Sequence, residues 1–588
     1  MQTSLFLLIC LCTLLRSTRA ATKGYCTLPG LLLPKPTRLA SSSPVAKAGL
    51  KLDGLFDNIA NGSILAGFDA RNISFTIGMI SLSDPLPLWE YHHLAPANID
   101  GTKTPDGDSE WMIGSISKVF TDLIVLRLGL DVNDPVHKYL PQLKGGDSET
   151  DWDSITLASL ANHMSGIRMN YGYPEIYDLV PSFEALGFPP LGPSDFPTCG
   201  IAGLNKACDP NQLIEALKNS HPVVSPHDRP IYSSISFTLL SYALQAATGR
   251  NYTQLLQDEV LNPLSLTHTG AQPGNTTNAV IPATQPNSWG VDYGDNAPGG
   301  GLHSSLNDLA RLAHSILART TLPNPADVRK WLQPTGFTGP ANNLVGAPWE
   351  IFRSQALTGQ HNVDIHAKDG GALAYVARMA LLDSYGVAFV AFTAGGKGNE
   401  ALDPVFEAAL ATFGPAVERA ARDEAAQLYV GTYSRGGNVT GSLVLGMDDG
   451  PGLKVRDVRR DGVDMLGAIR AVWDLQPVSP GVLDTDFRLY PMGVSREVSR
   501  LWNGEEVGVI EEDWRMLIAP DASGNNTSSL PKAGTGIWES RCAAWQSVDT
   551  LYYGGEPIDR FVVVKDMKRG VVVGIESPAL RLTLEKKN

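Results

Sequence analysis

The chain has 588 residues, of which 43% are hydrophobic and 18% are charged, so it has room for two to four domains with large cores. This composition argues against disorder as the main state. The formal charge of −14 disfavours binding to nucleic acid or to an anionic membrane surface, because both are themselves negatively charged.

The first 20 residues have the features of a cleaved signal peptide. An apolar run from Ser4 to Leu15 is followed by Thr18-Arg19-Ala20, whose small residues suit a signal peptidase. A membrane anchor is the alternative interpretation, but the run is too short to cross a hydrocarbon core of ~30 Å. We therefore expect residues 1–20 to be removed and the mature protein to be secreted, without a membrane partner.

Four cysteines follow the leader, and four thiols in an oxidising compartment allow three disulfide pairings. The short gap between Cys199 and Cys208 favours a local bridge between them. Cys26 is then left to pair with Cys542, which would tie the two ends of the chain together. Metal binding is the competing interpretation, but no C-x-x-C pair is present, so we expect no metal site.

Seven Asn-x-Ser/Thr sequons agree with passage through a eukaryotic secretory route. The last two overlap, and we expect at most one of them to be modified. The candidate glycosylation sites are Asn61, Asn72, Asn251, Asn275, Asn438, Asn525 and Asn526.

After a Pro/Ser/Gly-rich lead-in at 21–45, helical periodicity alternates with β-rich segments over residues 46–415. Helices grouped between strands indicate an α+β domain whose sheet is completed late in the sequence. The expected helices are Ser117–Leu128, Ile155–Met164, Asn211–Asn219, Ser233–Thr248, Ser305–Thr320 and Ala401–Phe413. The expected strands are Ser74–Ser81, Ile365–Lys368, Tyr375–Leu382 and Val387–Ala394.

A second domain is predicted over residues 424–588, joined to the first by a helical connection at 416–423. Short β-prone runs separated by Gly, Asn and Asp are typical of an antiparallel sheet or a small barrel. The expected strands there are Leu428–Tyr433, Ser442–Leu445, Asp486–Tyr490, Glu506–Glu511 and Arg560–Val564.

The first candidate for chemistry is Ser115, which precedes Lys118 by three residues at the start of a predicted helix. Positions i and i+3 share a helix face, so the amine can reach back to the hydroxyl. A serine hydroxyl attacks a carbonyl only when a base takes its proton, and a lysine can be that base only when neutral. Burial and a neighbouring cation both lower a lysine pKa from ~10.4 towards that state.

Two further segments follow in a fixed order. Tyr232-Ser233-Ser234 opens another predicted helix, and Lys368-Asp369-Gly370-Gly371 lies on a predicted strand. Ser-x-x-Lys, then Tyr-Ser-x, then Lys-x-Gly resembles the serine β-lactamase and penicillin-binding-protein superfamily. The resemblance covers roughly residues 50–415. It also includes the segments Leu130–Val136, Lys138–Pro141, Ile155–Leu157, His163–Ile167, Gly299–Ser305 and Asp308–Ala310.

This resemblance implies a β-lactamase-like domain, in which an antiparallel sheet is flanked by helices and joined by an all-helical subdomain, followed by a smaller β-rich, barrel-like domain. It implies that Ser115 is the acylated nucleophile and that Lys118 accepts its proton. Tyr232 would pass that proton onward or activate the deacylating water. Lys368 would keep the local field positive, and the backbone N–H groups of Ser115 and Gly371 would form an oxyanion hole.

Three positions near these motifs affect the expected substrate. Ser234 stands where many relatives carry Asn, which puts β-lactam hydrolysis in doubt. Asp369 places an acid beside Lys368 and would partly neutralise a carboxylate-binding pocket. His366 would share a strand face with Lys368 and could line the pocket with Gly370, whereas His163 is expected to be a structural hydrogen-bonding residue.

The leading hypothesis is a secreted serine hydrolase that cleaves a small-molecule or peptide-like ester or amide, without a cofactor. The first alternative is an acyltransferase in natural-product biosynthesis that uses the same acyl-enzyme, and the second is a non-catalytic binding protein on a degenerate scaffold. The sequence contains no G-x-S-x-G elbow, H-E-x-x-H zinc helix or P-loop motif, so the corresponding enzyme classes are excluded.

Overall fold

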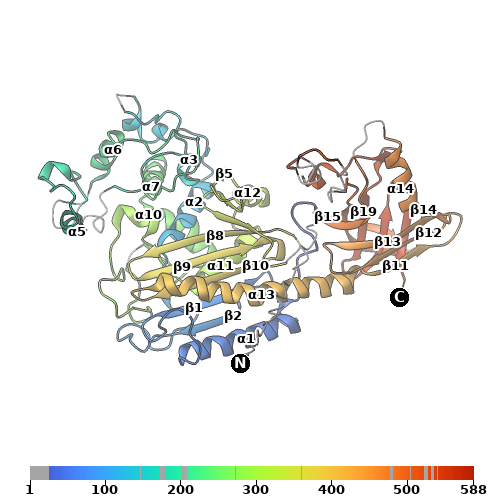
Figure 1. The fold of residues 1–588 in the computed structure, drawn as a ribbon, viewed down its shortest axis with the longest axis horizontal. Coiled ribbons are helices and arrows are strands. Elements are labelled where there is room, and N and C mark those ends of the chain that lie inside the picture. Colours follow the sequence, from blue (N-terminus) through green and yellow to red (C-terminus); the bar gives the residue numbers. More distant parts are fainter. Residues whose placement is uncertain are drawn as a thin grey trace, which may run out of the picture.

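The computed structural model has two β-sheet regions connected by one long helix (Figure 1). The fold is α+β, as expected from the sequence. The structure describes residues 25–587 except 146–147, 172–178, 201–205, 207, 272, 359–360, 477–480, 503–504, 522–527, 532–535 and 539–540. The predicted signal peptide therefore lies outside the described residues, as do Asn525 and Asn526.

The first region is built on an antiparallel sheet with the strand order β2-β1-β10-β9-β8-β7-β6-β5. The neighbouring interior strands β1 and β10 are buried along their whole length, which their apolar and small residues permit. The strands are β1 (Ser74–Ser81), β2 (Asp84–His93), β5 (Gly336–Phe337), β6 (Asn343–Val345), β7 (Glu350–Ser354), β8 (Val363–Ala372), β9 (Tyr375–Leu382) and β10 (Val387–Ala394), with a separate pair β3 (Glu110–Met112) and β4 (His303–Ser305). Three expected strands match β1, β9 and β10, and the fourth lies inside the longer β8.

Helices cover both faces of this sheet. On one face, α1 (Ser43–Ala60) and α13 (Gly398–Tyr429) pack against each other and over an apolar cluster that includes Phe75 and Phe389. On the other face, α11 (Leu306–Leu317) packs against β1, β2 and β10, and the remaining helices gather beyond it. Those helices are α2 (Ser117–Arg127), α3 (Leu157–Ala161), α5 (Val180–Ala185), α6 (Pro210–Lys218), α7 (Ile235–Thr248), α8 (Tyr252–Leu256), α9 (Asn262–Leu264), α10 (Ala297–Gly300) and α12 (Pro325–Trp331).

Of the helices that are shorter than the sequence predicts, such as α7 and α11, α3 differs most in relative length. The periodicity suggested Ile155–Met164, whereas α3 spans Leu157–Ala161. The backbone of His163 has a φ of 63°, in the left-handed region, so the helix cannot continue through it. This turn brings the imidazole back beside α7.

The second region is a closed barrel. Its strands follow the order β12-β11-β21-β20-β19-β16-β15-β13-β14, and β12 also pairs with β13, which closes the sheet around an apolar core that includes Trp514. The elements are β11 (Gly431–Arg435), β12 (Gly441–Gly446), β13 (Leu453–Arg460), β14 (Val463–Asp464), α14 (Met465–Asp474), β15 (Arg488–Trp502), β16 (Glu505–Met516), β17 (Tyr552–Tyr553), β18 (Glu556–Pro557), β19 (Arg560–Asp566), β20 (Val572–Ser577) and β21 (Leu582–Lys586). A β-rich, barrel-like C-terminal domain is thus confirmed.

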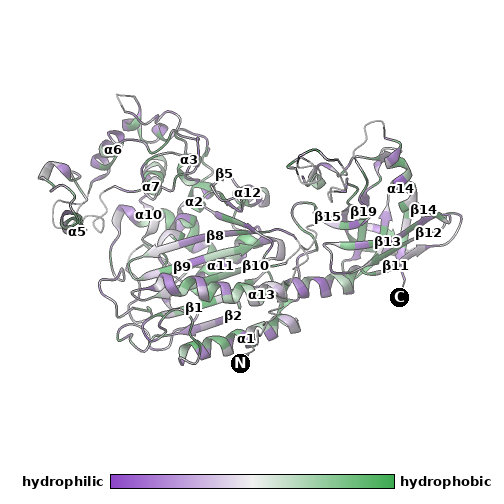
Figure 2. Cartoon of the chain, viewed as in Figure 1, coloured by the Kyte–Doolittle hydropathy of each residue, from purple (hydrophilic) through white to green (hydrophobic). Residues whose placement is uncertain are grey.

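Helix α13 runs through the predicted connection at 416–423. The sequence indicated separate helical segments on either side of Gly414-Pro415, but α13 continues without a break across them. Pro415 cannot donate the helical hydrogen bond of its position, yet Phe413 and Val417 are buried on either side of it, and this packing holds the helix together. Figure 2 shows hydrophilic and hydrophobic residues alternating along α13, as expected for a helix with one buried face.

Disulfides join Cys26 to Cys542 and Cys199 to Cys208, the two pairings that the sequence favoured. The described sequon asparagines are all exposed, namely Asn61, Asn72, Asn251, Asn275 and Asn438. Within the described residues, no helix is long and apolar enough to cross a membrane.

Candidate active site

Ser115 lies in a tight turn that leads directly into α2. The turn spans Gly114–Ile116, and Ser115 itself is half-buried. Ser117 fixes the turn, because its hydroxyl donates to the carbonyl oxygen of Gly114 at 2.6 Å and accepts from the backbone N–H of Leu302 at 3.1 Å. The serine is therefore held by backbone contacts and not by a flexible loop.

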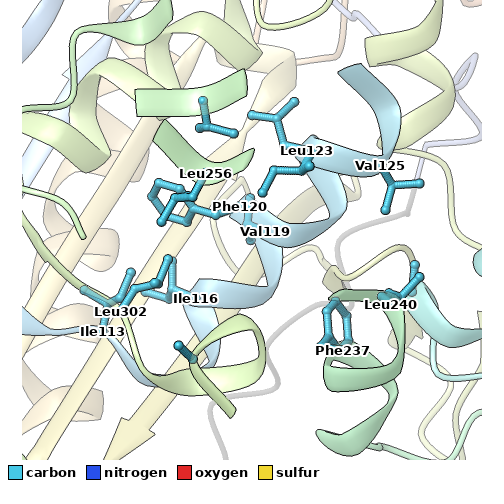
Figure 3. Close-up of a cluster of buried hydrophobic side chains, with 14 of the residues drawn as sticks. Ile113, Ile116, Val119, Phe120, Leu123, Val125, Phe237, Leu240, Leu256 and Leu302 are labelled. Carbon is cyan, nitrogen blue, oxygen red and sulfur yellow. The ribbon is translucent and has the colours of Figure 1, made fainter. Parts of the chain in front are cut away.

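The rest of α2 is anchored by apolar packing. Nearly every residue of this helix is buried, so its first turn has little freedom to move. Figure 3 shows its side chains within a larger cluster of buried apolar residues, in which Ile113, Ile116, Val119, Phe120, Leu123, Val125, Phe237, Leu240, Leu256 and Leu302 are labelled.

Lys118 lies in the first turn of α2 and is fully buried. Its Nζ atom donates hydrogen bonds to Ser115 Oγ at 3.0 Å and to Ser234 Oγ at 3.4 Å, and also to the carbonyl oxygen of Gly299. The three-residue spacing therefore produces the contact that the sequence predicted.

The electrostatic environment of this amine favours its neutral form. Burial lowers the pKa of Lys118 to about 8, the neighbouring Tyr232 opposes the shift, and the positive charge of Lys368 adds to it. An amine with such a pKa can accept the proton of the serine hydroxyl at mildly alkaline pH.

Tyr232 lies close to the side-chain nitrogen atoms of two lysines. The Nζ atoms of Lys118 and Lys368 are each 5.1 Å from the centre of its ring. Burial alone would raise the pKa of Tyr232, but the charges of Lys368 and Lys118, together with hydrogen bonds to Ser115 and Lys118, lower it below its ordinary value. This lowered pKa makes it easier for the phenol to lose or exchange its proton.

His163 supports this tyrosine from the other side. The two rings stack with their centres 4.4 Å apart. The backbone N–H of Ser233 donates to Nδ1 of His163 at 3.2 Å, and the N–H of Ile231 donates to its carbonyl oxygen at 2.9 Å. Burial lowers the pKa of His163 well below its usual range, so the ring is neutral and acts as a support. The sequence assigned it this structural role.

Lys368 is buried on β8 and is paired with an acid that sequence reasoning missed. Its Nζ atom lies 2.5 Å from Oε1 of Glu350 on the neighbouring strand β7, and the backbone N–H of Asp369 donates to Oε2 at 3.0 Å. Burial alone would lower the pKa of Lys368, but Glu350, Tyr232 and Asp369 together raise that pKa above its ordinary value. This lysine therefore stays charged.

The sequence placed the acid Asp369 beside Lys368, and its backbone carbonyl oxygen accepts a hydrogen bond from Lys368 Nζ at 3.0 Å, but its carboxylate binds elsewhere. Its carboxylate accepts two hydrogen bonds from Arg378, at 2.7 and 2.6 Å. Successive strand residues point to opposite faces of the sheet, so Asp369 lies on the face away from Lys368. Its charge still adds a smaller upward contribution to the pKa of Lys368.

Gly370 and Gly371 bring the end of β8 against the serine turn. A Cβ atom at Gly370 would lie 1.9 Å from the carbonyl oxygen of Ile113, so no other residue fits there without a backbone shift. Gly371 is exposed, and a Cβ atom on it would meet nothing within 4 Å. The N–H groups of Ser115 and Gly371 thus belong to two backbone segments in close contact.

His366 shares a face of β8 with Lys368 but contacts a different part of the molecule. Its Nε2 atom donates to the carbonyl oxygen of Leu332 at 2.7 Å, and it lines a cavity with Arg353 and Asp383. Within the described residues, no hydrogen bond joins His366 to Ser115, Lys118 or Tyr232. No set of three or more His, Cys, Asp or Glu side chains in the described part of the chain is arranged to hold a metal ion.

The sheet, the serine turn and the buried lysines define a class of protein, and comparison with known families agrees with it. The chain belongs to the β-lactamase family, whose model matches residues 88–412, more than half of its length. A second model, described as "Beta-lactamase-like-like, C-terminal domain", matches residues 421–588.

Individual proteins are similar to this chain over most of its length. A "Beta-lactamase-like protein" of Arthroderma benhamiae is 44% identical, with 97% of each chain covered. A "Probable hydrolase M10" of a Phoma species is 25% identical over 90% of this chain and 87% of its own. Among solved structures, a penicillin-binding protein homologue from Pyrococcus abyssi matches 80% of this chain and 98% of its own, with 16% identity and a TM-score of 0.44.

Proposed function

We propose that the protein is a secreted serine hydrolase that cleaves an ester or amide through an acyl-enzyme on Ser115. The observation that carries the proposal is the contact of 3.0 Å between Lys118 Nζ and Ser115 Oγ, made by an amine whose pKa burial lowers to about 8. Relatives named as hydrolases support the general reaction class.

In the first half of the reaction, neutral Lys118 accepts the hydroxyl proton while Ser115 Oγ bonds to the substrate carbonyl carbon. The oxyanion that forms accepts hydrogen bonds from the backbone N–H groups of Ser115 and Gly371. The tetrahedral intermediate then expels an alcohol or amine, and the proton held by Lys118 passes through Tyr232 to this leaving group.

In the second half, water attacks the acyl carbon of the Ser115 ester. A proton from this water passes to Tyr232 while the phenol gives its own proton to neutral Lys118, a relay that the lowered pKa of the phenol favours. Collapse of the second intermediate releases the carboxylic acid, and the Ser115 oxygen regains its proton. No cofactor is needed for this balance.

The charges near Ser115 favour an uncharged substrate. Lys368 is already paired with Glu350, so a substrate carboxylate would have to compete with a partly buried ion pair. Ser234 offers a hydroxyl where a carboxamide would be needed to contact an amide carbonyl. Neutral esters and amides meet these conditions better than penicillin-like acids do.

Secretion is part of the same proposal. The apolar leader at 1–20, the two disulfides and the exposed sequon asparagines are all features of proteins that pass through the secretory pathway. The mature N-terminus of protein recovered from culture medium tests it, because cleavage after Ala20 leaves Ala21 as the first residue.

The test of the mechanism is labelling with a fluorophosphonate, followed by peptide mapping. We expect one label per chain, on Ser115, and complete loss of labelling in Ser115→Ala, while the exposed-serine control Ser41→Ala labels like wild type. A panel of chromogenic esters, peptides and β-lactams should show turnover of neutral esters that Ser115→Ala lacks.

An unlabelled wild-type protein would favour a non-catalytic binding role, and turnover retained by Ser115→Ala would refute the mechanism. Adding a competing alcohol separates hydrolysis from acyl transfer. Formation of a new ester in excess of free acid would identify an acyltransferase that uses the same acyl-enzyme.

A further inference from the structure

A cavity of about 400 Å³ lies along α2, the helix whose first turn carries Lys118. Its size falls within the range of sites for small organic ligands. Its walls are mainly apolar, and they come from α2, α3, α12 and the segments between them. The apolar lining residues are Val125, Leu126, Leu130, Val132, Leu157, Ala158, Ala161, Leu322, Pro323, Trp331 and Ala347.

One residue in this apolar wall is a buried acid. Asp122 is 3% exposed, and its Oδ2 atom accepts a hydrogen bond from the indole N–H of Trp331 at 2.6 Å. Within the described part of the chain, no donor bonds to its other oxygen, and the residue lines the cavity. The proposed reaction makes no use of this carboxyl group.

The remaining charges at this cavity also favour a cation. Asp131, Asp327 and Lys330 line it from exposed positions and together carry one net negative charge. Burial raises the pKa of Asp122 to about 7, against a smaller downward effect of the Trp331 hydrogen bond. A cation that binds beside Asp122 would favour loss of the carboxyl proton, which needs little free energy near neutral pH.

We propose that this cavity binds a small apolar organic cation, with its ammonium group on Asp122 and its hydrocarbon part against the apolar walls. Such a ligand satisfies the free carboxylate oxygen and removes apolar surface from water at the same time. The site is separate from the Ser115 group and does not depend on the proposed hydrolase activity.

The competing explanation is that Asp122 serves only to attach α2 to α12 through the Trp331 hydrogen bond. That role needs an acceptor oxygen but no charge and no open cavity. Asp122→Asn separates the two explanations, because its amide oxygen can still accept from the indole while its charge is lost.

The probe is cyclohexylmethylamine, and its neutral control is cyclohexylmethanol. Calorimetry with the full chain should give 1:1 binding of the amine, with an affinity that rises about tenfold from pH 6 to pH 8 as Asp122 ionises. At pH 6, binding should release about 0.9 proton per ligand, read from buffers of different ionisation enthalpy, and at pH 8.5 almost none. The alcohol should show neither effect.

Two variants complete the test. Asp122→Asn should weaken amine binding at pH 8 at least about tenfold and remove its pH dependence, while keeping the thermal transition of wild type. Ala158→Trp should fill the cavity and block the amine although Asp122 is intact. Equal binding by wild type and Asp122→Asn, binding that survives in Ala158→Trp, or no binding at millimolar amine would overturn the proposal.

Discussion

Lys118 at the start of helix α2 and Lys368 on strand β8 face the same tyrosine from two different parts of the first domain. Both are buried, and both Nζ atoms lie 5.1 Å from the centre of the Tyr232 ring. Their pKa values nevertheless move in opposite directions: burial lowers that of Lys118, whereas Glu350, Tyr232 and Asp369 together raise that of Lys368 despite its burial. In the proposed mechanism, the direct ion pair of Glu350 with Lys368 makes that lysine the fixed cation and leaves Lys118 as the base.

The difference shows that depth of burial does not assign a role to a lysine. Lys118 donates to two hydroxyls and a backbone carbonyl, none of which carries a charge, so its neutral form is accessible. Lys368 has a carboxylate at 2.5 Å and keeps its proton. The following changes test this division of labour.

The largest expected effect comes from replacing each lysine by arginine. Arginine keeps its charge at all working pH values and cannot act as a base. Lys118→Arg should lose about 10³-fold in the rate of fluorophosphonate labelling, while Lys368→Arg, which retains the pair with Glu350, should lose only about tenfold. Equal losses in the two variants would show that the lysines do not have distinct roles.

The next effect concerns the contact between the end of strand β8 and the turn that carries Ser115. Gly370→Ala would force a Cβ atom to 1.9 Å from the Ile113 carbonyl oxygen and displace the serine turn, so the labelling rate should fall about 100-fold. Gly371→Ala meets open space and should stay within about threefold of wild type. A thermal melt of both variants checks folding, and similar labelling rates would show that this close approach does not position the serine.

The third effect is on stability. A pKa of about 8 for Lys118, against its ordinary 10.5, corresponds to a cost of about 3 kcal/mol for burying the charged form at pH 7. Lys118→Met should therefore be inactive but more stable at pH 7, by a net amount on the order of 2 kcal/mol after the lost hydrogen bonds are counted. Denaturant melts at several pH values measure this.

The pH dependence of stability should show the same effect of burying this amine. Between pH 8 and about 10.5 the unfolded chain holds a proton on Lys118 that the folded protein has released, so this residue's contribution to wild-type stability rises with pH across that window. The advantage of Lys118→Met should shrink over the same interval. A variant that is less stable than wild type at pH 7 would show that the amine is not a strained base.

The smallest effect is a displaced pH profile. The negative charge of Glu350 raises the pKa of Lys118, so Glu350→Gln should move the rising limb of the labelling rate to lower pH, by about half a pH unit. Asp369→Asn, which alters a carboxylate bound to Arg378 on the other face of the sheet, is the control and should leave that limb nearly in place. An unmoved limb in Glu350→Gln would argue against this coupling.

The parts of the site that the sequence predicted are local or ordered along the chain. Ser115 and Lys118 meet because three residues bring them to one helix face, and Tyr232 and Lys368 follow from the order of the motifs. Glu350 was missed because it lies 18 residues before its partner, and strand pairing, which sequence periodicity does not reveal, brings the two together. No local pattern marks Glu350 as the partner of Lys368, because the segment Trp349–Arg353 does not alternate regularly between apolar and polar residues.

The fold also has parts that the local sequence pattern predicts and parts that it does not. Strands β1, β9 and β10 were predicted because continuous or alternating apolar residues mark buried strands. The short strands β5, β6 and β7 carry little apolar pattern and were not predicted. Strand β15 extends to Trp502, well beyond its predicted end at Tyr490, because its outer part is exposed and is held by ion pairs such as Arg500 with Glu511.

The continuity of α13 has a practical consequence for anyone who divides this protein. Truncation at residue 415 would cut the helix near its middle and remove Val417, Ala420 and Ala421, which would expose the apolar surface of the first region that they cover. A shortened enzyme that retains the helix to Tyr429 would keep that packing but expose the residues that meet the barrel. The two halves share this one helix, so neither has a natural cutting point inside it.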